Sequence, residues 1–158
     1  MLDLRRVTAR PDRSFVVFLI GMRVNAWWKP WKWMPVAAAM PRMLEELGRA
    51  PSLGFLGGES FFGRTTLMLS YWESTEHLLA FAKDDARAHM PAWKGFYSAG
   101  RSGDVGIWHE TYTIAPGTFE NVYVAMPPFG LGRAFGVVEA RGELSRAKGR
   151  LAGRPIAA

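Results

Sequence analysis

The hydrophobic pattern begins with residues 15–24, FVVFLIGMRV, a run of apolar and β-branched side chains. A run of this kind, followed by the polar Asn25, predicts a strand that is buried on both faces. Strand alternation places Arg23 and Asn25 on the face of Phe15, at the end of an otherwise apolar row. We therefore expect these two polar side chains to meet a ligand or solvent.

The segment MPVAAAMPRMLEELG, residues 34–48, has apolar side chains at helical spacing. Pro35 suits the first turn of such a helix, and Gly48 suits its end. The pattern predicts an amphipathic helix. Pro41 lies inside it and is expected to kink or split it, because proline lacks a backbone donor and clashes with the preceding turn.

Four further segments carry strand or helix patterns. They are a Gly-punctuated hairpin at 53–72 with its second strand from about residue 65, a helix capped by Ser74 or Thr75 and limited by Pro91, a strand at 105–114, and a shorter strand at 120–126. The order strand, helix, strand, strand, helix, strand predicts an α+β fold with a ferredoxin-like split β-α-β sheet and an extra C-terminal strand. Two helices cover one face of such a sheet, and a second subunit is expected to cover the other.

The length of 158 residues and a hydrophobic content of 49% fit one domain, and the absence of cysteine excludes disulfides and thiolate metal sites. The net charge of +6 comes from the chain ends, because residues 14–131 are balanced. We expect a basic arm at 1–13, the folded domain at 14–131, and a basic, largely flexible tail at 132–158. A neutral body argues against nucleic acid. No apolar run is long enough to span a membrane, so a cytoplasmic location is expected.

Residues 25–33, NAWWKPWKW, contain four of the seven tryptophans. Such a cluster could be a membrane-surface anchor, a base-stacking platform, the rim of an apolar pocket, or an aromatic cluster that only packs. The spacing of Trp27, Trp28, Trp31 and Trp33 does not allow all of them to face one way. Some are therefore expected to pack, and others to contact a ligand.

The three histidines are the strongest candidates for chemistry, because no nucleotide-binding, nucleophile-elbow or zinc-protease motif is present. His77 falls in the first turn of the second helix, where a capping role is expected. His89 lies near the end of that helix. Alternation places His109 on the face of Val105 and Ile107, where imidazole could be a packed core residue or an acid, base or iron ligand.

Three segments together resemble a known family: FLIGMRVNAWWKPWKWMPVAAAMPRML, RTTLMLSYWESTEHLLAFAKDDARAHMPAWKGF and GIWHETYTIAPGTFENVYVAMPPFGLG. The resemblance covers about residues 12–133 and is to DUF4188, a family that includes fungal monooxygenases of antibiotic-biosynthesis type. It implies a dimeric α+β barrel, in which each subunit has a ferredoxin-like sheet and a ligand pocket between sheet and helices.

The resemblance implies a small monooxygenase-like oxidative enzyme that needs no cofactor and acts on an apolar or aromatic small molecule. In this interpretation Arg23 and Asn25 polarise the substrate oxygen, and His89 or His109 handles the proton. The tryptophans expected to contact substrate are Trp27, Trp28, Trp31, Trp72 and Trp93. One alternative is a haem b protein of aldoxime-dehydratase or haem-degrading type, with His89 as axial ligand. The other is a non-catalytic small-molecule binding protein, and a homodimer is expected in each case.

Overall fold

The protein is described by a computed structural model over residues 4–83 and 100–152. Its larger sheet is antiparallel, with strand order β3-β4-β2-β5. The strands are β2 (Phe15–Val24), β3 (Phe55–Phe61), β4 (Leu67–Trp72) and β5 (Val105–Ile114). The two helices that connect them are α1 (Pro30–Gly48) and α2 (Thr75–Lys83). The fold is therefore α+β and ferredoxin-like, as the order of the patterns predicts.

Helix α1 begins earlier than its sequence pattern indicates and contains both Pro35 and Pro41. The expectation that Pro41 splits the helix is wrong, because α1 is continuous from Pro30 to Gly48. Buried Val36, Met40 and Leu47 hold it against the sheet. Packing of this apolar face outweighs the loss of the two backbone hydrogen bonds that Pro35 and Pro41 cannot donate.

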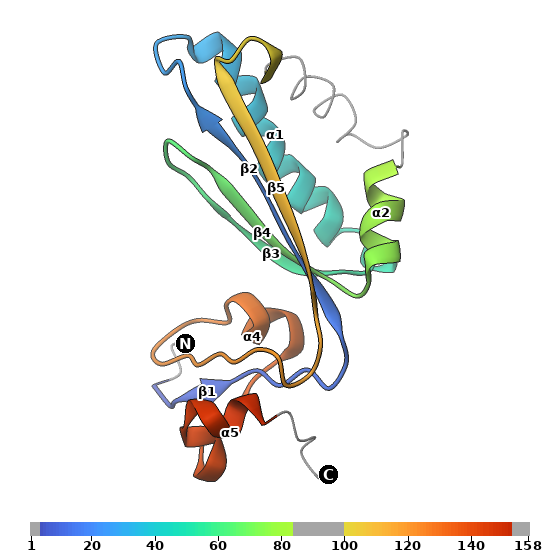
Figure 1. The fold of residues 1–158 in the computed structure, drawn as a ribbon, viewed down its shortest axis with the longest axis vertical. Coiled ribbons are helices and arrows are strands. Elements are labelled where there is room, and N and C mark those ends of the chain that lie inside the picture. Colours follow the sequence, from blue (N-terminus) through green and yellow to red (C-terminus); the bar gives the residue numbers. More distant parts are fainter. Residues whose placement is uncertain (1–3, 84–99, 153–158) are drawn as a thin grey trace.

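The main core lies between the sheet and the two helices. One cluster joins β2 and β5 to the N-terminal half of α1, and its buried members are Met22, Val24, Val36, Met40 and Val105. A second cluster joins β2 and β4 to the end of α1 and to α2, and its buried members are Val16, Leu47, Trp72, Leu78 and Phe81. Figure 1 shows α1 running along one side of the sheet, with α2 beside its end.

Strand β2 is not equally buried on both of its faces, in contrast to the prediction from its apolar run. On the helix-covered face, Val16 and Ile20 are buried. On the other face, Val17 and Leu19 are half-buried, and Arg23 is exposed. The helix-free face of the sheet therefore stays partly open along β2.

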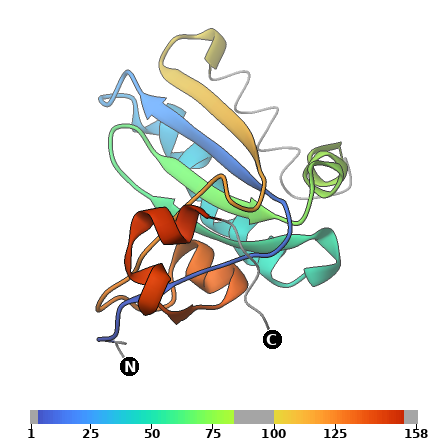
Figure 2. The same ribbon diagram turned by 60° about the horizontal axis from the view of Figure 1, so that its bottom comes forward.

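The two chain ends form a second small unit, which we call the terminal module (residues 4–9 and 119–152). Strand β1 (Val7–Thr8) pairs with β6 (Val138–Glu139), and α4 (Gly130–Phe135), the 3₁₀ turn η2 (Gly142–Ser145) and α5 (Ala147–Leu151) complete it. Figure 2 shows these elements gathered at one end of the large sheet. The extra strand expected at 120–126 is reduced to isolated bridge positions at Tyr123, which pairs with Val7, and at Met126.

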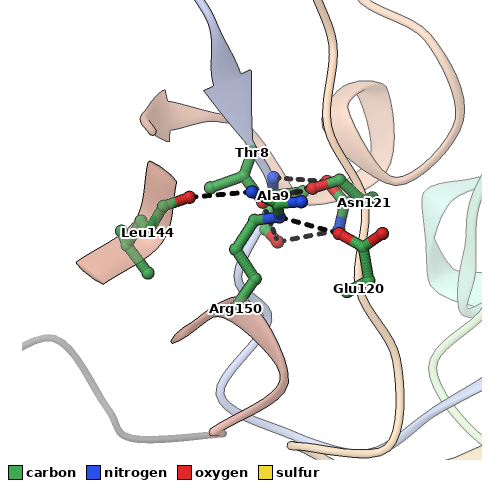
Figure 3. A network of polar contacts seen from close by, with 6 residues as sticks. All are labelled: Thr8, Ala9, Glu120, Asn121, Leu144 and Arg150. Atoms are coloured by element: carbon green, nitrogen blue, oxygen red, sulfur yellow. Dashed lines mark hydrogen bonds and ion pairs between the residues drawn. The ribbon is translucent and has the colours of Figure 1, made fainter. Parts of the chain in front are cut away.

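The expectations of a separate basic arm and a largely flexible tail are wrong for the described part of these segments. Arg150 of α5 is buried, and its guanidinium donates to the carboxylate of Glu120 (2.7 Å) and to the carbonyl of Leu144 (2.9 Å). Asn121 binds the backbone of Ala9 twice, with its Oδ1 accepting from Ala9 N (2.7 Å) and its Nδ2 donating to Ala9 O (2.9 Å). Figure 3 shows this network joining both chain ends.

Aromatic side chains attach the terminal module to the sheet. The ring of Phe15 on β2 lies 5.2 Å from that of Phe119 and 5.2 Å from that of Phe135. Tyr71 of β4 lies on the same side, 6.4 Å from Phe15. The module thus covers one end of the helix-free face.

Within the described residues, no helix has the length and apolar character to cross a membrane.

Candidate functional site

A largely apolar cavity of about 150 Å³ lies between the sheet and the two helices. It is lined by Phe18, Ile20, Met43, Met68, Trp72, Leu78, Leu79, Phe81, Ala82, His109 and Thr111. In another protein, an apolar cavity of about 150 Å³ stays dry and holds one benzene molecule. This cavity therefore has the size and character for a single aromatic ring or a short branched chain.

Trp72 forms a fixed wall of the cavity. Its side chain is 1% exposed, and its indole N–H donates to the hydroxyl of Ser70 at 3.0 Å. Ser70 in turn donates to the carbonyl of Phe18 at 3.1 Å. The rings of Phe55 (5.5 Å) and Phe81 (5.3 Å) pack against the indole. Because these contacts set its orientation, Trp72 can shape a ligand site as well as fill the core.

His109 places an imidazole at the edge of this apolar space. It lies on edge strand β5 opposite Ile20, so its side chain points to the helix-covered face, as alternation predicts. Its ring is exposed and lies 6.1 Å from the ring of Phe18. An accessible imidazole beside an apolar cavity can act as a general acid or base toward a bound ligand.

His77 has the capping position that its sequence context predicts. Its backbone N–H donates to the hydroxyl of Ser74 at 3.4 Å, and its Nδ1 lies 3.1 Å from the same oxygen. Its ring packs so closely on Gly54 that a Cβ there would lie 2.5 Å from the ring. His77 therefore belongs to the start of α2 and not to the cavity.

Arg23 and Asn25 are not brought together with His109. Arg23 lies opposite Gly106 in the β2–β5 ladder, and its side chain is on the helix-free face of the sheet. Its guanidinium donates to the hydroxyl of Thr65 at 3.1 Å. Asn25 lies beyond the end of β2, five residues from Ile20, which corresponds to about 16 Å along a strand. Its amide donates to the carbonyl of Gly103 at 3.1 Å. Any role of these two side chains in the cavity is therefore indirect.

Three of the tryptophans expected to contact substrate lie outside the cavity. Trp27, Trp28 and Trp31 are 71%, 59% and 66% exposed at the junction between β2 and α1. Trp27 and Trp28 border an open groove of about 440 Å³. Of the tryptophans named for substrate contact, Trp72 is thus the one that the described residues bring to the cavity. His89 and Trp93 lie outside the described residues.

The described residues contain no group of three His, Cys, Asp or Glu side chains that could hold a metal ion. A haem is far larger than a single aromatic ring, and sites for drug-sized ligands have volumes of about 300 to 1,000 Å³. The part of the cavity that the described residues line, about 150 Å³, is therefore too small for haem, and the expected axial ligand His89 lies outside these residues.

Several cavity residues were not identified by sequence reasoning. Phe18 and Ile20 share the face of His109 across the β2–β5 ladder, while Met43 and Phe81 come from the two helices. Strand alternation could have placed Phe18 and Ile20 on the helix-covered face. No sequence signal gives the register that sets Ile20 opposite His109.

The sequence of this chain matches a known protein family. Residues 15–131 match the family described as monooxygenase af470-like. The chain is 34% identical over 92 residues to monooxygenase af470 of Aspergillus fumigatus, an alignment that covers 58% of this chain and 32% of that protein. The match thus spans about a third of the length of this relative.

A search of solved structures agrees with the fold. The crystal structure of an aldoxime dehydratase in complex with butyraldoxime has a TM-score of 0.65 and 14% sequence identity, over 78% of this chain and 38% of that chain. At this identity the likeness shows the fold alone. The family match, by contrast, covers most of the chain. The protein therefore belongs to the monooxygenase af470-like family.

Proposed function

We propose that the protein is a small monooxygenase-like enzyme that oxidises an apolar or aromatic small molecule in the cavity between sheet and helices. The observation that carries this proposal is a ring-sized apolar cavity with one imidazole, that of His109, at its edge. Family membership supports the oxidative class. The shape and apolar lining support the substrate class.

In the proposed reaction the cavity walls exclude water and hold the ring of the substrate. Trp72 is held by Ser70 and by two aromatic neighbours, so it offers a rigid surface that loses little entropy when a ligand binds. Met43 and Met68 can adjust to the outline of the ligand, because thioether side chains are flexible. Because apolar walls exclude water, a charge interaction formed at His109 would also be stronger than in bulk solvent.

His109 is the proposed general base. It would take the proton from a phenol or enol at the mouth of the cavity, leaving an electron-rich anion that reacts with O₂. For oxidation of a phenol to a quinone, the substrate loses two hydrogens, one from the O–H and one from the ring carbon that becomes a carbonyl, and gains one oxygen atom; the second oxygen atom leaves as water. The electrons come from the substrate, so this reaction needs no separate reductant.

Oxygen consumption with a panel of single-ring phenols tests this role. The variant His109→Gln should lower kcat by roughly 10²- to 10⁴-fold, the range typical of a positioned acid or base. His77→Gln is the matched control, because it makes the same substitution outside the cavity, and it should leave kcat within about twofold. Equal rates for wild type and His109→Gln would refute the catalytic role. Ligand binding without oxygen consumption across the panel would favour a binding protein.

We also propose that a second copy of the chain covers the open part of the helix-free face. Half-buried Leu19, Leu69 and Trp108 lie there, and Tyr112 is 46% exposed. The terminal module already covers the end near Phe15. An open apolar row of this kind is typical of an interface. Sedimentation at micromolar concentration should give a dimer, and a stable monomer near 17.7 kDa would contradict this assembly.

A further inference from the structure

The end of the molecule that contains the tryptophan cluster is built from three chain segments, which we call the tip (residues 25–34, 61–65 and 101–104). The backbone N–H of Val24 donates to the carbonyl of Arg64 at 2.8 Å, and that of Ala26 donates to the carbonyl of Asp104 at 3.1 Å. These bonds hold the three segments together. Figure 1 shows the start of α1 and the segment before β5 at the end of the molecule opposite the terminal module.

The tip exposes a cluster of large apolar side chains. Trp27, Trp28 and Trp31 are 59–71% exposed, Phe62 is 64% exposed and Met34 is 55% exposed. The rings of Trp27 and Trp28 are in edge contact, with centroids 6.2 Å apart. Isolated exposed apolar residues are common in proteins, whereas a cluster of large ones is typical of an interaction surface.

The tip is also basic. Exposed Lys32, Arg64 and Arg101 lie in its three segments, and Asp104 is its one acidic residue. Asp104 is paired with Lys29 at 2.9 Å, and this hydrogen bond lowers the pKa of the Asp104 carboxyl. The first turn of α1 contains no acidic side chain, so the positive end of the helix dipole is not neutralised there.

A basic N-terminal turn costs helix stability, because cations are favourable at the opposite end of a helix. Lys32 in the first turn of α1 therefore opposes the helix dipole, and its favourable interaction within the tip is the attraction to Asp104, which is already paired with Lys29. Trp31 lies beside it in the sequence, and its side chain is 66% exposed. A partner with an anionic surface and an apolar layer beneath it would bind both the cation of Lys32 and the exposed indole of Trp31.

We propose that the tip docks on the surface of an anionic lipid bilayer. In this arrangement the indoles of Trp27, Trp28 and Trp31 enter the headgroup region, where amphipathic rings are favoured. Lys32 and Arg64 contact the lipid phosphates. The inference does not depend on the proposed oxidation, since the tip and the cavity share no lining residue.

Nucleic acid is the competing anionic partner, because bases can also stack on tryptophan. Single-stranded binding sites combine stacking rings with a basic groove that follows the backbone. The tip instead adds Phe62 and Met34 to its tryptophans, which suits an apolar layer better than a phosphate backbone. We therefore favour the bilayer, and nucleic acid is an outcome of the test.

Vesicle flotation with the full chain tests the charge contribution. Vesicles of phosphatidylcholine with one quarter phosphatidylglycerol should bind the protein, and vesicles of pure phosphatidylcholine should bind it weakly. Lys32→Gln with Arg64→Gln should lower the partition coefficient about 25-fold, roughly fivefold for each cation near an anionic surface. The matched control, Arg146→Gln with Lys148→Gln, removes two exposed cations of the terminal module and should leave partitioning unchanged.

The triple variant Trp27→Ala, Trp28→Ala, Trp31→Ala tests the apolar contribution. It should lose detectable vesicle binding while keeping the wild-type melting temperature, because all three side chains are exposed. Absence of wild-type binding at millimolar lipid, or equal binding by this variant, would overturn the proposal. Loss of dimer in the variant would assign the tip to a subunit interface, and tight binding of a single-stranded oligonucleotide that competes with vesicles would assign it to nucleic acid. Either result would also overturn it.

Discussion

Replacing Arg150 by alanine should destabilise the terminal module. The Arg150 side chain is 4% exposed and bonds to the carboxylate of Glu120 at 2.7 Å and the carbonyl of Leu144 at 2.9 Å. Hydrogen bonds to charged groups contribute about 1.5 to 3 kcal/mol each. Glu120 is 34% exposed and can regain water, so we take a total loss of about 2 to 3 kcal/mol.

Differential scanning calorimetry is the suitable assay, because the terminal module contains no tryptophan and fluorescence would not report on it. For a chain of this length, 2 to 3 kcal/mol corresponds to a decrease in Tm of about 4 to 12 °C. Arg146→Ala is the control, since its side chain is exposed and close in sequence, and it should change Tm by no more than about 2 °C. Equal Tm values for the two variants would show that the buried ion pair does not hold the module.

Three other predictions concern stability and cofactor. Gly21→Ala should lower the free energy of unfolding, because the new Cβ would lie 2.0 Å from the carbonyl oxygen of Thr66. Gly48→Ala is the matched substitution in open space at the end of α1, and it should raise the free energy of unfolding by up to about 1 kcal/mol. Urea unfolding measures both changes. Burial raises the pKa of Tyr71 to about 12, so its contribution to stability is complete below pH 10 and is lost as the pH rises through 12, which absorbance at 295 nm can follow. Added haemin should give no Soret band that survives gel filtration; a band that His89→Ala removes would support the haem interpretation.

The large sheet could be predicted from the sequence because its strands have clear patterns. Strands β2 and β5 have the predicted bounds, since the first run lies between Ser14 and Asn25 and the second begins after Asp104 and ends just before Pro116. The terminal module could not be predicted in this way. Its segments are short and rich in glycine and charge, and Arg150 reaches its partner Glu120 across 30 residues of sequence. Composition shows the charge of Arg150 but not the carboxylate that permits its burial.

The candidate site was predictable in part. Alternation placed His109 on the helix-covered face, and the fold brought Trp72 to the same cavity. Arg23 and Asn25 were grouped with the histidine because polar residues at a strand end suggest a site. The register shows instead that Arg23 faces away, and that β2 carries Asn25 well past Ile20. Residue type alone does not fix which end or which face of a strand is used.

The cavity between the sheet and the helices should bind an aromatic ring, and binding of 4-fluorophenol, followed by ¹⁹F NMR, is the most direct test. Ala82 lines the cavity, so Ala82→Leu adds three carbon atoms to a space of about 150 Å³ and should weaken binding by at least about tenfold. Ala80 lies exposed on the same helix, and Ala80→Leu makes the same change outside the cavity and should leave the Kd unchanged. Equal Kd values for both variants and the wild type, or no binding by the wild type, would contradict the account.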